Sequence, residues 1–205
     1  MAKHFVSNSI ESVRMFKSDF IEMFSKVHFS IPLIIYIPVI AYFFYYSIAE
    51  KEVSVVWSIV LFVSGAIGWS LTEYLLHRFV FHYHPKSEFG KRLHWTFHGV
   101  HHDYPQDRYR LVMPPSISIP LAFIFWYLFS FIIGNTFTPA FFSGFVAGYL
   151  TYDSLHYAVH HFAFRNRLLL SIKKHHMKHH YLEPDSGFGV STPIWDYIFR
   201  TKSAN

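Results

Sequence analysis

Histidine is the residue type in this sequence whose number and spacing could do chemistry. Of the 205 residues, 16 are histidine, and 12 of these fall in four short groups. Neutral imidazole nitrogens bind iron, zinc, copper and nickel, so histidines repeated at short spacing predict metal binding. In chain order the groups are His77 and His82; His98, His101 and His102; His156, His160 and His161; and His175, His176, His179 and His180.

The spacing within the groups has a meaning on a helix. Successive residues of an α-helix are about 100° apart, so residues four apart lie about 40° apart on one face. The HxxxH spacing of the third group would place two rings on one stripe. The HxxHH spacing of the second and fourth groups would place three rings on two adjacent lines. The longer step from His77 to His82 suits a helix end, with His77 in the last turn and His82 on the chain that leaves it.

The four groups offer ten histidines in ligand spacing, which is too many for one ion. Two ions with about five nitrogen ligands each fit this count, because even a six-coordinate ion keeps positions for solvent or substrate. His161 and His175 are equally suited to supporting a ligand or to facing solvent. His4, His28, His84 and His94 lie outside the pattern. The predicted ligands are His77, His82, His98, His101, His102, His156, His160, His176, His179 and His180.

Two carboxylates stand close to the histidine groups. Glu73 precedes His77 by four residues and Asp153 precedes His156 by three, so each is predicted to share its histidine's helix face. Metal-bound histidines usually donate their other ring N–H to a carboxylate or a carbonyl. Both acids are therefore candidate catalytic residues that support a ligand from behind. A structural salt bridge, for example with Arg78, is the alternative.

The composition indicates a membrane protein. Apolar residues make up 52% of the chain and charged residues only 15%, against roughly 25% charged in soluble domains. The sequence has no cysteine, which excludes disulfides, thiolate zinc sites, iron–sulfur clusters and cysteine nucleophiles. The net charge of +5 comes from basic residues beside apolar runs, so nucleic acid is not an expected partner.

Four apolar runs predict about four transmembrane helices, since about 20 apolar residues cross a bilayer. The runs cover residues 29–49, 53–76, 117–133 and 137–150. The last two are short and are separated by Gly-Asn-Thr, so they form either two short spans or a helical hairpin that dips in and returns. Residues 1–28 have apolar residues at helical spacing, which predicts an amphipathic N-terminal segment that lies on the membrane or on the protein's own body.

The basic residues predict the orientation. Of 18 lysines and arginines, only Lys51 lies in a connection on the far side. The positive-inside rule therefore places the N-terminus and the histidine-rich sections 77–116 and 151–205 on the cytoplasmic face. The predicted fold class is an all-α, multi-pass membrane protein whose cytoplasmic, histidine-rich helical cap holds a di-metal site.

The histidine groups, in this order on a chain with four apolar runs, resemble the fatty acid hydroxylase superfamily of membrane di-metal oxygenases. Two further stretches narrow the resemblance: Tyr109–Pro115, which reads YRLVMPP, and Gly187–Asp196, which reads GFGVSTPIWD. Both are similar to the fatty acid 2-hydroxylase branch, which acts on sphingolipid acyl chains. The resemblance predicts a hydroxylase domain over residues 29–205.

That resemblance implies a monooxygenase, an oxidoreductase that uses O2 to add a hydroxyl at carbon 2 of long fatty acyl groups of sphingolipids or ceramides. It assigns the same ten histidines to two iron ions. Zinc has no redox chemistry, although it could fill the site in a purified sample. Eukaryotic members often carry a fused cytochrome b-type domain, which the first 28 residues cannot hold. Electrons from NAD(P)H are therefore expected through a separate carrier, of cytochrome b type or a ferredoxin, and its reductase.

The expected location is the endoplasmic reticulum membrane in a eukaryote and the inner (plasma) membrane in a bacterium. One alternative keeps the metals and changes the substrate, as in a sterol oxidase, carotenoid hydroxylase or desaturase. Another is a non-enzymatic metal transporter. Transporters place ligands near the bilayer midplane, whereas the runs 29–49 and 117–150 contain no histidine.

Overall fold

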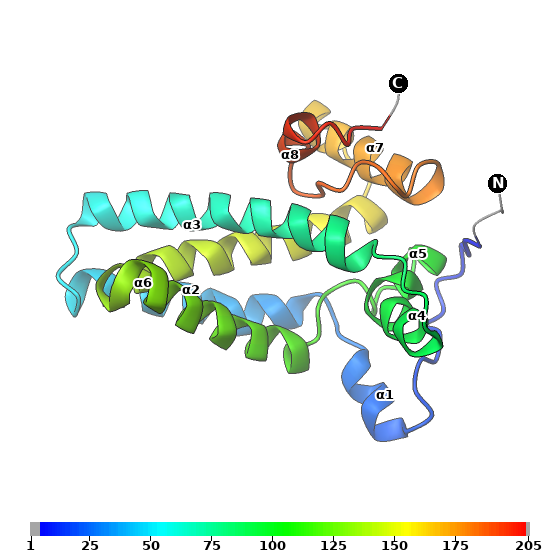
Figure 1. Ribbon diagram of the computed structural model, residues 1–205, viewed down its shortest axis with the longest axis horizontal. Coiled ribbons are helices and arrows are strands. Elements are labelled where there is room, and N and C mark those ends of the chain that lie inside the picture. The colour runs from blue at the N-terminus through cyan, green and yellow to red at the C-terminus, as the bar shows by residue number, and fades with distance from the viewer. Residues whose placement is uncertain (1–4, 204–205) are drawn as a thin grey trace.

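The computed structural model describes residues 5–203, and every regular element in that range is helical. Three helices are long and apolar enough to cross a membrane: α2 (Ser30–Ala49), α3 (Val55–Leu76) and α6 (Pro115–His161). They run side by side along the long axis, and the short helices gather towards one end (Figure 1). The predicted all-α membrane fold is confirmed.

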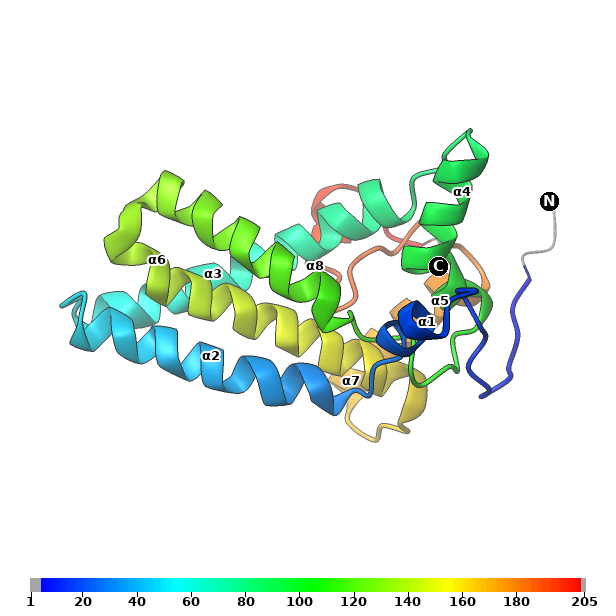
Figure 2. The same cartoon turned by 90° about the horizontal axis from the view of Figure 1, so that it is seen from below.

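The long element α6 is a helical hairpin. At Gly134 the backbone has φ 79° and ψ 156°, a conformation that costs glycine little because it has no Cβ atom. There the chain reverses, so that a first arm (115–133) and a second arm (135–161) lie antiparallel (Figure 2). The two short apolar runs are the arms of this one element. The second arm stays helical well past residue 150, where the apolar run ends, because Leu155 and Ala158 still favour helix.

Both reversals of the long helices lie at the end opposite to the short helices (Figures 1 and 2). One is the hairpin turn of α6, and the other is the connection from α2 to α3. In that connection the Ser54 hydroxyl caps α3 by accepting from the backbone N–H of Trp57 at 3.4 Å. Of the 18 lysines and arginines, only Lys51 lies in either reversal.

The backbones of α3 and the second arm of α6 are in direct contact at two glycines. A Cβ atom on Gly65 would lie 2.0 Å from the carbonyl oxygen of Phe141, and one on Gly144 would lie 1.8 Å from that of Phe62. Small residues allow such close approach between membrane helices, where packing rather than water exclusion drives association. Beside this contact, Trp69, Phe145 and Tyr149 form the centre of the buried core.

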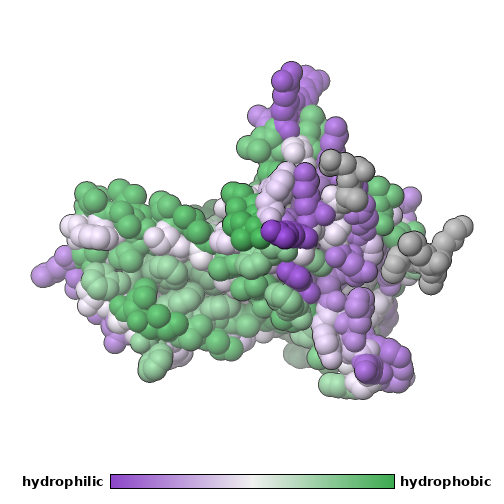
Figure 3. Space-filling view, turned by 45° about the horizontal axis from the view of Figure 1, so that its top comes forward, coloured by the Kyte–Doolittle hydropathy of each residue, from purple (hydrophilic) through white to green (hydrophobic). Residues whose placement is uncertain are grey.

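The outer surface of the long helices is apolar. Side chains such as Ile34, Val56, Val63 and Phe131 are exposed, and they form an apolar band along the long helices, while polar side chains gather at the end with the short helices (Figure 3). An apolar band of this extent on a water-soluble monomer would be unusual. It is the surface that a bilayer would cover. We call the end of the molecule that carries the short helices the polar end.

The polar end is built from short helices that carry most of the histidines. After η1 (His77–Phe81), a π-helical turn that continues α3, the chain forms α4 (Glu88–His94), a second π-helical turn η2 (Trp95–Gly99) and α5 (Val100–Asp103). Beyond α6, it forms α7 (Arg167–Tyr181) and α8 (Ile194–Ile198). The side chain of Asn166 caps α7 by accepting from the N–H of Leu168 at 2.9 Å.

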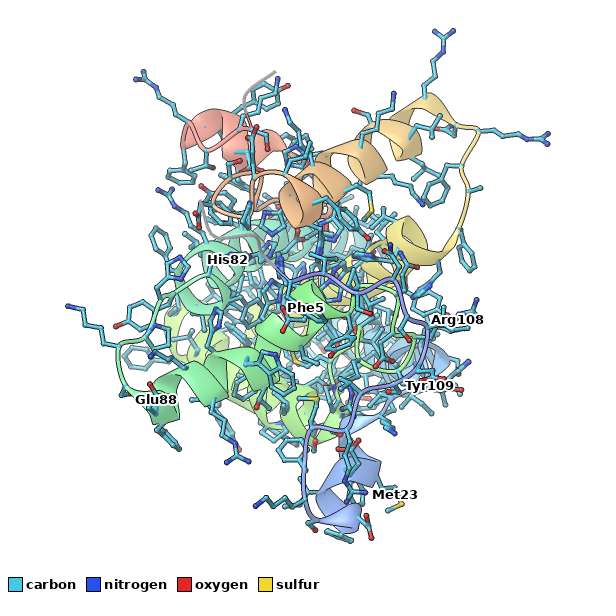
Figure 4. The ribbon with its side chains drawn as sticks, turned by 90° about the vertical axis from the view of Figure 1, so that its right-hand side faces the viewer. Phe5, Met23, His82, Glu88, Arg108 and Tyr109 are labelled. Carbon is cyan, nitrogen blue, oxygen red and sulfur yellow. The ribbon has the colours of Figure 1, made fainter. Side chains whose placement is uncertain are left out.

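The N-terminal segment is mostly not helical. Among residues 5–28 only α1 (Asp19–Ser25) is a helix, so the predicted amphipathic helix is shorter than its periodicity suggested. The reason is Arg110, which holds the segment in place by donating to the carbonyl of Val13 at 2.6 Å and to Glu22 at 2.5 Å. The tip of α1 exposes Met23, which lies well away from His82 when the polar end is viewed face-on (Figure 4).

The glycine contact predicts a stability test. Gly65→Leu should force α3 and α6 apart and lower the melting temperature in detergent by about 5 °C or more, because overpacking costs about 1–3 kcal/mol. Ser64→Leu is the matched control, since Ser64 is exposed one residue away. Equal melting temperatures for the two variants would contradict this account of the packing.

Candidate metal centre

The ten histidines predicted as ligands meet at the polar end in two groups of five. Within each group, one ring nitrogen from every member lies within 4.8 Å of all the others. The first histidine group consists of His77, His82, His98, His102 and His179, and the second consists of His101, His156, His160, His176 and His180. Both combine residues from the sections before and after α6. His28, His84, His94, His161 and His175 belong to neither group, and His4 lies outside the described residues.

Each HxxHH pattern divides between the two groups. His98 and His102 are four residues apart and join the first group, while His101 turns to the second. On α7 the division is reversed: His176 and His180 join the second group and His179 joins the first. Two adjacent lines of rings on one helix face therefore serve two neighbouring sites, which explains why these patterns have three histidines rather than two.

The pair His77 and His82 lies at a helix end whose last turn is π-helical. The N–H of His82 donates to the carbonyl of His77 at 3.0 Å, a bond between residues five apart. This wider turn brings the Nε2 atoms of the two rings to 3.2 Å, so the five-residue spacing becomes a ligand spacing. Single π-helical turns often occur at functional sites. The sequence predicted the helix end but not the widened turn.

The distances between ring nitrogens fit a common ion in each group. In the first group, Nε2 of His98 lies 3.0 Å from that of His77 and 3.0 Å from that of His102. In the second, Nε2 of His176 lies 2.9 Å from that of His160 and 3.0 Å from that of His180. Two nitrogens bound at about 2.1 Å and at right angles to each other on one ion are about 3.0 Å apart. The residues present therefore fit two metal ions with nitrogen ligands.

Burial keeps these rings neutral, as metal ligation requires. Burial, reinforced by the neighbouring His179 and His102, lowers the pKa of His82 to about 2. Burial likewise lowers the pKa of His179 to about 4, although its bond to Ser186 opposes the shift. The pKa values of His98 and His176 also lie well below the usual value, with burial the main cause. At neutral pH each of these rings has one lone pair free for a metal.

Two ligands of the first group are oriented by backbone carbonyls. Nδ1 of His77 lies 2.5 Å from the carbonyl oxygen of Phe188, and Nδ1 of His179 lies 2.7 Å from that of Ser186. A carbonyl can only accept, so both rings donate from Nδ1 and keep the lone pair on Nε2. Acceptors of this kind fix the tautomer and the orientation of a metal-binding histidine.

Among the described residues, neither predicted carboxylate hydrogen-bonds directly to the ring of its histidine. Glu73 accepts from the N–H groups of Val190 and Ser191 at 2.7 Å and 2.8 Å and from the Ser191 hydroxyl. Nδ1 of His77 donates to the Phe188 carbonyl instead of to Glu73. Asp153 is buried on the same arm as His156. Nδ1 of His156 has no hydrogen-bond partner among residues 5–203. Among the described residues neither acid forms a salt bridge, and Arg78 donates to the Tyr74 hydroxyl.

A carboxylate that the sequence analysis missed, Asp196, is completely buried beside the first group. It accepts from the N–H groups of Phe188 and Gly189 at 2.9 Å and 2.8 Å, from the Thr201 hydroxyl at 2.8 Å and from His175 at 3.1 Å. Burial alone would raise its pKa, but these hydrogen bonds together hold the pKa below the usual value. Its only sequence signal was its place at the end of the GFGVSTPIWD stretch.

The N-terminal segment crosses the polar end of the molecule. The N–H of Ser7 donates to the carbonyl of Asp103 at 2.7 Å, and Phe5 packs edge-on against Tyr104 with ring centroids 5.7 Å apart. In the end-on view, Phe5 lies in front of α5, towards the viewer (Figure 4). The segment therefore covers α5, which carries ligands of both histidine groups.

Comparisons with known proteins identify the class. The fatty acid hydroxylase family model matches residues 62–201, and the chain belongs to that family. It is 37% identical over 192 residues to a dihydroceramide fatty acyl 2-hydroxylase of Arabidopsis thaliana, covering 93% of this chain and 80% of the relative. It is also 37% identical to the fatty acid 2-hydroxylase of Homo sapiens over 92% of this chain, but spans only 56% of that protein.

A solved structure shares the fold. The hydroxylase domain of full-length scs7p aligns with a TM-score of 0.85 and 33% identity, over 91% of this chain and 70% of that one. The predicted resemblance to the fatty acid hydroxylase superfamily, and to its 2-hydroxylase branch, is confirmed. The chain is thus a fatty acid 2-hydroxylase-like enzyme, an oxidoreductase whose two histidine groups could hold metal ions.

The two groups predict the metal content. Purified protein loaded with Fe²⁺ or Zn²⁺ should hold two ions per chain by elemental analysis. His98→Ala removes a ligand from the first group and His156→Ala one from the second, so each should lower the content to about one ion per chain. His84→Ala, at a side chain that is 78% exposed, should keep both ions. A parent protein that holds one ion, or none, would overturn the assignment.

Proposed function

We propose that this protein uses O2 to add a hydroxyl group at carbon 2 of long-chain fatty acyl groups, with ceramide-type sphingolipids as the substrate class. The observation that carries the proposal is the meeting of ten imidazoles, eight of them buried and two half-buried, in two groups at the polar end of apolar helices. Membership of the fatty acid hydroxylase family and the names of the relatives, which include dihydroceramide and fatty acid 2-hydroxylases, support the reaction and the substrate class.

Two iron ions, one in each histidine group, would supply the redox chemistry that activates O2. The chain's own residues hold the ten imidazoles neutral and close together and keep water from the site. Phe81 stacks on His98 with ring centroids 5.0 Å apart, and Phe188 packs against His82 at 5.3 Å. These rings form an apolar wall around the first group, and the absence of bulk water protects reactive species from side reactions.

An apolar cavity next to the metal centre is suited to the reacting end of an acyl chain. It has a volume of about 40 Å³ and lies between α2, α3 and both arms of α6. Its lining includes Trp69, Phe145 and Tyr149, and also Leu76, which directly precedes the ligand His77. A cavity of this size holds only the few carbons next to the reacting one. The rest of the chain would extend along the apolar helices towards the bilayer.

We place the polar end on the cytoplasmic face of the membrane, that of the endoplasmic reticulum in a eukaryote or the inner membrane in a bacterium. The support is the distribution of basic residues, of which only Lys51 lies at the opposite end. This orientation gives the metal centre access to cytoplasmic reductants.

The reaction class is tested by lipid mass spectrometry of cells that express the protein. Cells with the parent protein should accumulate 2-hydroxylated acyl chains in their ceramides, whereas His98→Ala should reduce the product to the background level. His84→Ala should match the parent at equal expression. Hydroxylation at another carbon, or on sterols or carotenoids only, would refute the proposed reaction.

Electrons are proposed to arrive from NAD(P)H through a separate carrier and reductase. Basic side chains exposed at the polar end, among them Lys86, Lys91, Arg92 and Lys174, suit an acidic carrier such as a cytochrome b-type protein or a ferredoxin.

Iron-loaded protein with O2 and substrate should therefore turn over at most once. Addition of reductase and carrier should restore continuous product formation, and charge reversal at Lys91 and Arg92 should weaken that restoration. Sustained turnover with NADPH alone would exclude the separate carrier.

A further inference from the structure

A short loop near the C-terminus, residues 186–191, forms the outer side of the first histidine group. Two of its carbonyls, those of Ser186 and Phe188, accept from the outer nitrogens of His179 and His77. Its conformation depends on glycine. Gly187 has a φ of +70°, and a Cβ atom on Gly189 would lie 2.2 Å from the carbonyl oxygen of Thr192 and 2.9 Å from a carboxylate oxygen of Asp196.

Two buried carboxylates hold this loop through four consecutive backbone N–H groups. Asp196, in α8, accepts from those of Phe188 and Gly189. Glu73, on α3, accepts from those of Val190 and Ser191. The side chains come from distant parts of the chain, and the two residues are 0% and 4% exposed. Hydrogen bonds from backbone N–H groups to buried carboxylates are strong, so the loop is held firmly on both sides.

One peptide group connects Asp196 directly to a ligand. The N–H of Gly189 donates to Asp196 at 2.8 Å, and the carbonyl of the same peptide group, which belongs to Phe188, accepts from Nδ1 of His77 at 2.5 Å. A carboxylate on the N–H side polarises the amide and makes its carbonyl a stronger acceptor, because hydrogen bonds in a chain reinforce one another. A stronger acceptor on Nδ1 makes the opposite nitrogen, Nε2, more basic and a better metal ligand.

Four of the five rings in the second histidine group have no such support. Among the described residues, no hydrogen-bond partner reaches Nδ1 of His156, His160, His176 or His180. The two groups therefore have the same number of imidazoles but different surroundings.

We propose that Asp196 and Glu73 are positioning residues for the metal position of the first histidine group, and that they act through the loop 186–191. Asp196 acts through the peptide group between Phe188 and Gly189, and Glu73 by fixing the following two residues. This inference rests on the proposed binding of one ion by each group. It implies that the two metal positions differ in how firmly they hold an ion, because both acids support only the first.

The test is the release of metal to a chelator from protein loaded with Co²⁺, followed by the cobalt absorption spectrum. The variants are Asp196→Asn and Glu73→Gln, which keep the shape of each side chain and remove its charge. Each should release one of two equivalents about 10–100-fold faster than the parent, the usual effect of losing such a partner, and should leave the other equivalent unchanged. The bands of the faster equivalent should shift.

Glu22→Gln is the matched control. Glu22 is also a buried carboxylate that accepts from two backbone N–H groups, those of Met15 and Phe16, both at 3.0 Å, but it holds the N-terminal segment and touches no ligand. It should release both ions at the parental rate.

Equal acceleration of both equivalents, or parental release in both variants, would overturn the inference. If Asp196→Asn does not fold, the release rates of Glu73→Gln test the inference, because this variant leaves every bond of Asp196 in place. A parent protein that binds fewer than two cobalt ions would instead count against the proposed metal centre.

Discussion

Lone pairs that face one another repel, and this repulsion is the constraint on which the polar end depends. Ring nitrogens lie as close as 3.0 Å in the first group and 2.9 Å in the second, and burial keeps the rings neutral. A neutral imidazole has one N–H and one lone pair, so five rings whose lone pairs converge are stable only when a cation lies between them or when the backbone holds them in place. The fold does hold them, with α3, α5, α6 and α7 each fixed by contacts away from the site. Metal binding would then relieve a repulsion that folding imposes.

The two groups also depend on each other, because α5 and α7 contribute rings to both. A rotation of α7 that improved the position of His179 in the first group would displace His176 and His180 in the second. The helices are therefore free to move only in ways that suit both sites. The loop 186–191 is also connected to both helical parts of the site, to α3 by Glu73 and to α7 by the contact of Asp196 with His175.

The sequence predicted the parts of this structure that are encoded locally. The apolar runs located the long helices, and histidines at helical spacing selected the ten residues that the fold brings together, since both patterns depend on neighbours in the chain. It did not predict the π-helical turn at His77, which depends on packing. Nor did it predict the partners of Glu73 and Asp196, because Glu73 and Val190 are 117 positions apart and no local signal indicates their contact. The N-terminal helix was predicted too long for the same reason, since its limit is set by Arg110.

The second arm of α6 passes from the apolar band into the metal centre without a break. It packs on α3 at Gly144 and ends with His156 and His160, just as α3 continues through η1 to His77. Helices tilt when the hydrophobic thickness of a bilayer changes. Because α5 and α7 lie outside the band, such a tilt would move His77, His156 and His160 relative to the rings that complete their groups. The thickness of the host membrane would therefore affect the distances between the ligands of the metal centre.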